Sequence, residues 1–92
     1  MYLEIISPEA TLFTGKIESL TLPGANGSFQ ILENHAPIVS TLTAGTVKIK
    51  GNIHLSDDVK ELFTVLGKDE MTFAIGSGTV EMQENKIILL SD

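Results

Sequence analysis

The sequence predicts a mainly β fold, a two-sheet β-sandwich or flattened barrel of about nine to ten short antiparallel strands with one short helix. Three observations lead to this prediction. Apolar and polar residues alternate over short runs, as in strands that are buried on one side. Turns containing Gly and Pro separate these runs. The 92 residues include four Phe, one Tyr and no Trp, so Ile, Leu and Val must build the core, and β-branched residues favour strands.

Three runs open the chain and are expected to be strands. They are Tyr2–Ser7, Thr11–Thr14 and Ile17–Leu22. Pro8-Glu9 ends the first run, and Gly15-Lys16 is expected to turn the chain after the second. Strands of this length, separated by Gly and Pro, are typical of an antiparallel meander or sandwich.

The stretch Leu22–Pro37 is expected to hold one short strand between two displayed polar loops. Pro23-Gly24 and Asn26-Gly27 are turn dipeptides, where the chain needs a fixed or a positive φ. Ser28–Leu32 alternates between apolar and polar residues, as a half-buried strand does. Glu33-Asn34 breaks the run and begins the second loop.

The cleanest alternation in the sequence lies in Thr46–Lys50, where Val47 and Ile49 are expected to point inward. The strand before it is Pro37–Leu42. Its proline is placed at the strand entry, because the residue before a proline is pushed to extended conformations. Thr43–Gly45 turns the chain between these two strands.

Residues 51–69 break the strand pattern and predict a short helix near 57–66. Apolar side chains recur there at helical spacing: Val59, Leu62, Phe63 and Leu66. Ser56 is placed as an N-cap, and Gly67 lies where a glycine commonly ends a helix. The competing interpretation is a strand through Leu62–Leu66, since this run is rich in Phe, Thr and Val.

The C-terminal third returns to strands. Its expected strands and turns are Glu70–Ile75, a break at Gly76–Gly78, a strand through Val80 and Met82, a hairpin turn at Glu84-Asn85, and Lys86–Leu90. We find no internal repeat, low-complexity segment or linker.

The composition excludes several classes of function. Six Lys and no Arg stand against twelve acidic residues, a formal charge of −6, which argues against binding nucleic acid or an anionic membrane surface. A basic protein is the natural electrostatic partner. The absence of Cys excludes disulfides and thiolate metal sites. No apolar run approaches the roughly 20 residues of a membrane span, and no signal peptide is visible, so we expect an intracellular or peripheral protein.

The residues that could carry catalysis do not form a recognisable set. Ser77 lies between two glycines, but a nucleophile elbow needs a strand-to-helix turn, and a strand is expected next. No dinucleotide or phosphate-binding fingerprint is complete. His54, Asp57 and Asp58 could suggest a metal site, although helix capping explains the two acids. We therefore expect no catalytic, cofactor or metal site. His35 either fixes its own loop by bonding a backbone carbonyl or contacts a partner.

Several segments, taken in order, resemble the N-terminal domain of the ε subunit of F-type ATP synthase. They are Leu3–Glu9, Leu12–Gly15, Leu22–Gly24 with Gly27, Phe29 and Ile31, Asn34–Pro37, Ala44–Ile49, Val80–Met82 and Asn85–Ile87. The His-Ala-Pro segment is fairly specific, and the ordered set is much more specific than any one piece.

The resemblance implies a non-catalytic rotor subunit that clamps the γ subunit to the polar loops of the membrane c-ring. Proton- or sodium-driven rotation then reaches distant catalytic sites as torque, which supports ATP synthesis. Residues 1–92 are expected to form a single ε-type sandwich domain of about ten strands, with 51–69 as an insert and without the family's C-terminal helical hairpin. The expected location is the cytoplasmic face of a bacterial inner membrane, peripheral through the complex.

The resemblance places five residues at partner contacts: His35, Ser28, Glu33, Asn34 and Ser7. His35 matches the family's loop histidine and is expected near γ or the ring. Ser28 stands where many members have an acidic residue facing the ring, and Ser7 matches a position near γ. Gln30, Glu33 and Asn34 stand where glycine, proline and glycine are often found, and Glu33 could restore negative charge near the ring.

The alternative function is a free-standing β-sandwich module that binds a small ligand or a carbohydrate. Such modules usually expose Trp or Tyr platforms, and this chain has no Trp and one Tyr. A small enzyme is a third possibility, against which the missing nucleophile–base pair weighs.

Overall fold

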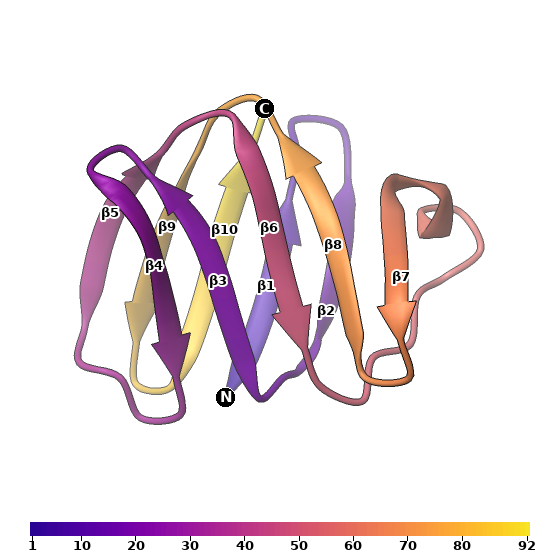
Figure 1. Ribbon diagram of the computed structural model, residues 1–92, viewed down its shortest axis with the longest axis horizontal. Coiled ribbons are helices and arrows are strands. Elements are labelled where there is room, and N and C mark those ends of the chain that lie inside the picture. The colour runs from indigo at the N-terminus through magenta and orange to yellow at the C-terminus, as the bar shows by residue number, and fades with distance from the viewer.

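The computed structural model describes residues 1–92 as ten strands in two facing layers (Figure 1). One layer contains β4, β3, β6, β8 and β7 in this order, and the other contains β5, β9, β10, β1 and β2. A single residue pair, Gly24 with Leu42, joins the layers between β3 and β5. The elements in chain order are β1 (Tyr2–Ile6), β2 (Thr11–Lys16), β3 (Ser19–Gly24), β4 (Gly27–Leu32), β5 (Ile38–Leu42), β6 (Gly45–Lys50), the 3₁₀ turn η1 (Lys60–Leu62), β7 (Phe63–Gly67), β8 (Glu70–Ile75), β9 (Gly78–Gln83) and β10 (Lys86–Ser91). The predicted β-sandwich is confirmed.

The core lies between the two layers and is built from inward positions of alternating strands. Its fully buried side chains are Leu3, Ile5, Leu20, Leu22, Ile31, Val47, Ile49, Val80, Met82, Ile87 and Leu89. The expected inward pair on β6 is therefore confirmed. Both layers contribute to the same cluster, so burying these residues holds the layers together.

Neighbouring strands run antiparallel, as expected, with one exception. β1 and β10 are parallel, with Leu3 beside Ile87. The first and last strands of the chain thus lie side by side within one layer. No short turn joins them, so the antiparallel direction that a hairpin imposes does not apply.

Two predicted turns are wrong. Gly15-Lys16 continues β2, and Pro23-Gly24 ends β3, while the two-residue turn into β4 is Ala25–Asn26. Proline is tolerated here because β3 pairs with β6 only up to Thr21 and with β5 only at Gly24. On that side of Pro23, no ladder needs the missing N–H.

The predicted helix at 57–66 is also wrong. Only the 3₁₀ turn η1 forms, and β7 follows it and pairs with β8. Val59 and Phe63 are buried, but Leu62 and Leu66 are about half exposed, at 52% and 54%. The Phe63 ring stacks on Phe73 at a centroid distance of 5.0 Å, so pairing with β8 overrides the helical spacing. The competing strand interpretation was the better one.

The segment between β6 and β7 covers one open side of the sandwich. Ile53 and Leu55 are partly buried against the core, and Val59 belongs to it. β7 itself is an edge strand of its layer and leaves Val65 exposed. The only helical element is three residues long, so no helix of this chain has the length to cross a membrane.

Candidate functional site

The five residues predicted to contact partners divide between two ends of the sandwich (Figure 1). Ser28 follows the β3–β4 turn and Ser7 follows β1, and both turns lie at the same end. Glu33, Asn34 and His35 follow β4 at the opposite end. The six residues of β4 span about 17–20 Å, so Glu33 lies a strand length from Ser28. The structure thus groups three of the predicted residues and separates them from the other two.

The loop after β4 begins with a tight turn over Leu32–His35. The His35 N–H donates to the Leu32 carbonyl at 3.1 Å, and Asn34 has a φ of 62°. In β-turns that favour glycine at the third position, the residue there has a positive φ. Asparagine adopts this region more readily than most other residues. Asn34 therefore supplies the conformation that glycine, expected at this position from the resemblance, adopts without strain.

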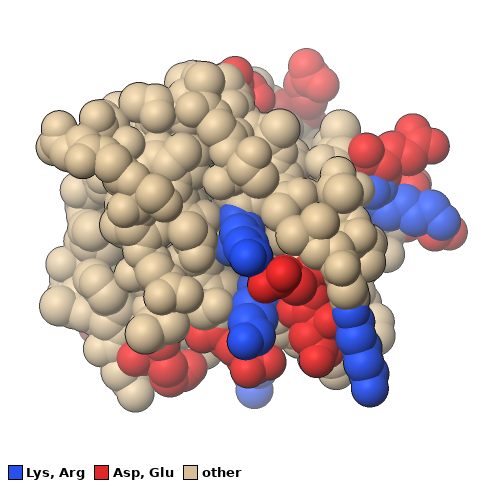
Figure 2. All heavy atoms as spheres, in the orientation of Figure 1, with Lys and Arg blue, Asp and Glu red and all other residues tan.

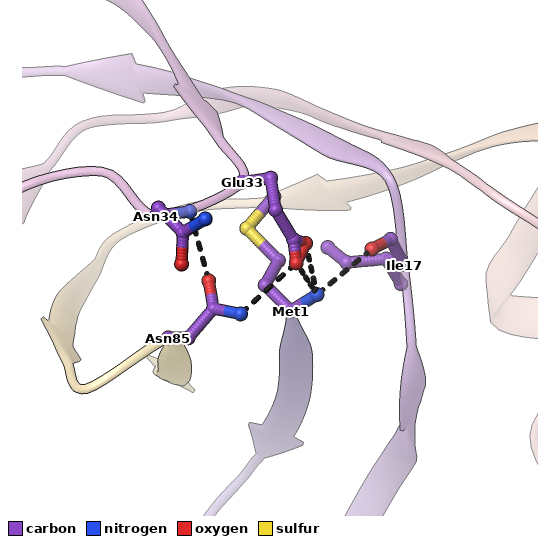
Figure 3. Close-up of polar contacts among 5 residues, drawn as sticks. All are labelled: Met1, Ile17, Glu33, Asn34 and Asn85. Carbon is purple, nitrogen blue, oxygen red and sulfur yellow. Dashed lines mark hydrogen bonds and ion pairs between the residues drawn. The ribbon is translucent and has the colours of Figure 1, made fainter.

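A network of polar contacts fastens this turn to two distant parts of the chain (Figure 3). The Met1 ammonium group donates to both Glu33 carboxylate oxygens at 2.6 Å. The Asn85 Nδ2 donates to Glu33 Oε1 at 2.9 Å. The Asn34 N–H donates to Asn85 Oδ1, also at 2.9 Å. The β4–β5 loop, the start of β1 and the β9–β10 turn are thus joined at one end of the sandwich.

His35 is exposed, and its ring is oriented by its own loop. The ring Nδ1 lies 2.7 Å from the Ala36 carbonyl oxygen. A carbonyl can only accept, so Nδ1 carries the proton and Nε2 is the free acceptor of the neutral ring. The two alternatives for His35 are thereby compatible: one nitrogen fixes the loop, and the other has no hydrogen-bond partner in the chain.

The Met1 ammonium group, by its hydrogen bonds, and then Asn85 lower the pKa of Glu33 below its ordinary value. The folded state therefore favours the carboxylate, and the stability this gives is complete at neutral pH and lost as pH falls through the lowered pKa. We expect Glu33→Gln to be less stable than the wild type at pH 7, with the difference shrinking as the pH falls below the ordinary pKa of a glutamate and through the lowered one. Urea unfolding at a series of pH values measures it. A difference that stays constant with pH would contradict a stabilising role for this ion pair.

The surface beside the loop is nearly free of charge. From Ser19 to Val47, Glu33 is the only formally charged residue, although the chain has 18 of them. This segment contains β3, β4 and β5, and Figure 2 shows an uncharged area over β3 and β4 with Lys, Asp and Glu gathered elsewhere. Val39 on β5 is 77% exposed, and Leu32 on β4 is 52% exposed. β5 belongs to the other layer, where the exposed Glu81 of β9 lies opposite Val39. We call the exposed side of β3 and β4 the uncharged face, and Val39 lies at its edge, beside Ser28 and Phe29.

The remaining candidates show less specific surroundings. The Ser7 hydroxyl donates to the Ala10 carbonyl at 3.2 Å, which closes the β1–β2 turn. Asp57 pairs with Lys60 at 3.4 Å instead of capping a helix. No group of three or more His, Asp or Glu side chains is placed to hold a metal ion. The contacts of Asn85 with Glu33 and Asn34 were not predicted from the sequence, in which Asn85 belongs to a hairpin turn and to a segment that resembles the family.

Comparisons with known proteins point to one family. The model for the β-sandwich domain of the ATP synthase delta/epsilon chain matches residues 1–92. The ATP synthase epsilon chain of Chlorobaculum tepidum is 38% identical over 90 residues, covering 98% of this chain and 86% of that one. The epsilon chain of Leptospira interrogans is 35% identical over 88 residues, and this chain spans only 58% of its length.

Solved structures show the same fold at low sequence identity. A chain of the Tetrahymena thermophila mitochondrial ATP synthase, from a structure of its central stalk and c-ring, superposes with a TM-score of 0.72 at 15% identity. The match covers 98% of this chain and 61% of that chain. A chain of the Euglena gracilis mitochondrial enzyme also gives a TM-score of 0.72, at 13% identity.

Proposed function

The chain belongs to the family of ATP synthase delta/epsilon chain β-sandwich domains, and on this basis we propose that it is a non-catalytic ε-type subunit of the ATP synthase central stalk. In this role it clamps the γ subunit to the polar loops of the c-ring, so that ion-driven rotation of the ring is transmitted as torque. It lies peripherally at the cytoplasmic face of a bacterial inner membrane and is held there by the complex.

The main support for this proposal is the uncharged face. Interface cores are depleted of charged residues relative to the rest of a protein surface. Here the chain has a formal charge of −6 yet presents one side with Glu33 as its only formally charged residue, and that carboxylate is bound to Met1 and Asn85. The exposed Val39 lies at the edge of this face, beside Ser28 and Phe29, where a partner would bury it.

The two ends of the uncharged face suit a clamp between two partners. Ser28 and His35 lie at opposite ends of β4, so one small partner feature cannot touch both. We assign the Ser28 end to the c-ring loops and the His35 end to γ. Ser7 is a second candidate contact with γ. A rigid β-sandwich keeps the distance between these contacts fixed, as transmission of torque requires.

A charge placed on the uncharged face tests the proposal. Val39→Lys is expected to weaken binding to the γ subunit by about tenfold or more, because the interface would bury an added ammonium group together with Glu81, which lies opposite Val39 in the β5–β9 pair. Isothermal titration calorimetry with purified γ measures the change. Val65→Lys is the matched control, since Val65 is also a well-exposed strand valine, at 65%, on β7 at the far edge of the layer that contains β3 and β4.

Equal effects of the two lysine variants would remove the uncharged face from the γ interface and leave the family assignment intact. Failure of the folded wild type to bind γ would count against the clamp itself. Adding His35→Ala to the same titrations locates the contact within the face, because His35 lies in the loop that we assign to γ.

A further inference from the structure

We propose that Asn85 is a positioning residue for the contact loop, Glu33–Pro37, and holds it in the conformation that the partner binds. This inference rests on the proposed function of that loop. Asn85 itself lies in the β9–β10 turn, about 50 residues further along the chain, and contacts the loop through both ends of its side-chain amide (Figure 3).

The orientation of the Asn85 amide is fixed by its neighbours. Its oxygen accepts the Asn34 N–H and its nitrogen donates to the Glu33 carboxylate, each at 2.9 Å. A flipped amide would put two donors together at Asn34 and two oxygens together at Glu33, so only one orientation satisfies all four groups. The Asn85 backbone carbonyl also accepts the Tyr2 N–H at 3.0 Å, which anchors the turn to β1.

The contact loop has few other attachments. Apart from the turn bond between His35 and Leu32 and the local bond of the His35 ring, its hydrogen bonds go to Met1 or Asn85. All five loop residues are exposed, so apolar packing does little to hold them. Removing the Asn85 side chain is therefore expected to loosen the loop while the sandwich stays folded.

The backbone role of Asn85 can be separated from its side-chain role. Glu84 and Asn85 both have positive φ, 51° and 62°, in the two-residue turn. Glycine adopts this conformation at least as well, so Asn85→Gly keeps the turn and deletes only the amide. Glu84→Gly is the matched control in the same turn, because the Glu84 side chain makes no hydrogen bond or ion pair.

The first measurement uses the chain alone. In Asn85→Gly, we expect amide hydrogen exchange at Asn34 and His35 to be about fivefold faster than in the wild type, since one hydrogen bond is lost outright and Glu33 loses a neighbour. Glu84→Gly should leave both amides unchanged. Because γ is absent, this result does not depend on the proposed function.

The second measurement is binding to γ, where we expect about a fivefold weaker affinity for Asn85→Gly and no change for Glu84→Gly. Asn85→Asp should weaken binding too, because it sets a second carboxylate beside Glu33. Adding Glu33→Gln restores a donor–acceptor pair in the reverse direction, so the double variant should recover the part of the affinity that does not depend on the ion pair between Glu33 and Met1. A residue needed only for its turn would show no such rescue.

Unchanged exchange at Asn34 in Asn85→Gly would overturn the inference, and so would a loosened loop that binds γ with wild-type affinity. If the wild-type chain does not bind γ, the proposed function fails, and the exchange data alone then decide whether Asn85 holds the loop.

Discussion

Replacing Leu89 by alanine is expected to lower the free energy of unfolding by about 2–5 kcal/mol. Leu89 is fully buried on β10, where Ile5 of β1 and Val80 of β9 flank it. The change removes buried apolar surface and leaves a cavity between layers that relax only in part. A chain of this size has about 5–14 kcal/mol of stability in all, so the loss is a large fraction of it.

Leu90→Ala is the matched control for this prediction. Leu90 is the next residue of the same strand, but its side chain points outward and is 47% exposed. We expect a change below about 1 kcal/mol there. Equilibrium unfolding in urea measures the two values, with the same dependence of the unfolding free energy on urea concentration used for both variants. Similar losses at both positions would contradict the assignment of Leu89 to the inner face of β10.

The same alternation explains why most of the fold could be predicted from the sequence. A period of two specifies which side of a strand is buried, and a one-residue shift would turn Val47 and Ile49 outward. Both are fully buried in the structure. The Glu84-Asn85 turn could also be predicted, because these residues lie between two alternating runs. Both adopt positive φ in the structure.

The helix failed because spacing alone does not distinguish a helix from a turn followed by a strand. Val59 and Phe63, which are four residues apart, are both buried, as a helix would also have them. In the structure, however, Val59 begins the 3₁₀ turn and Phe63 is the first residue of β7. The turn at Ser56 is closed by its backbone carbonyl, which accepts the N–H groups of Val59 and Lys60, without a side-chain cap. The free edge of β8 offered Phe63–Gly67 a partner, and this tertiary contact was invisible in the local pattern.

The candidate site shows the same limit over longer distances. Turn chemistry identified the loop that contains Glu33 and His35, because polar residues before a proline indicate a break between strands. Nothing local indicated that Glu33 meets Asn85, which is 52 residues away, or Met1. Those contacts follow from the topology, which brings the start of β1 and the β9–β10 turn to the end of β4 (Figure 1).

The misread Pro23-Gly24 dipeptide leads to the second large effect, at the other end of β4. Gly24→Ala is expected to destabilise the fold by about 1–3 kcal/mol. A Cβ at this residue would lie 2.7 Å from the Gly27 carbonyl oxygen and 2.8 Å from the Phe29 ring. Gly24 has no positive φ, so the cost is steric, and relieving it must move the hairpin that carries Ser28.

Gly67→Ala separates this close approach from the general effect of replacing a strand glycine. A Cβ at Gly67 meets no atom within 4 Å, and its φ is not positive either. Alanine there should be neutral, or stabilising by about 0.4–1 kcal/mol through the unfolded state. Thermal unfolding of both variants measures the difference in stability.

Because Gly24 also forms the one residue pair between β3 and β5, Gly24→Ala should weaken binding to the c-ring loops as well as lower stability. A destabilised Gly24→Ala that still binds the ring like the wild type would instead move the ring contact away from the Ser28 end.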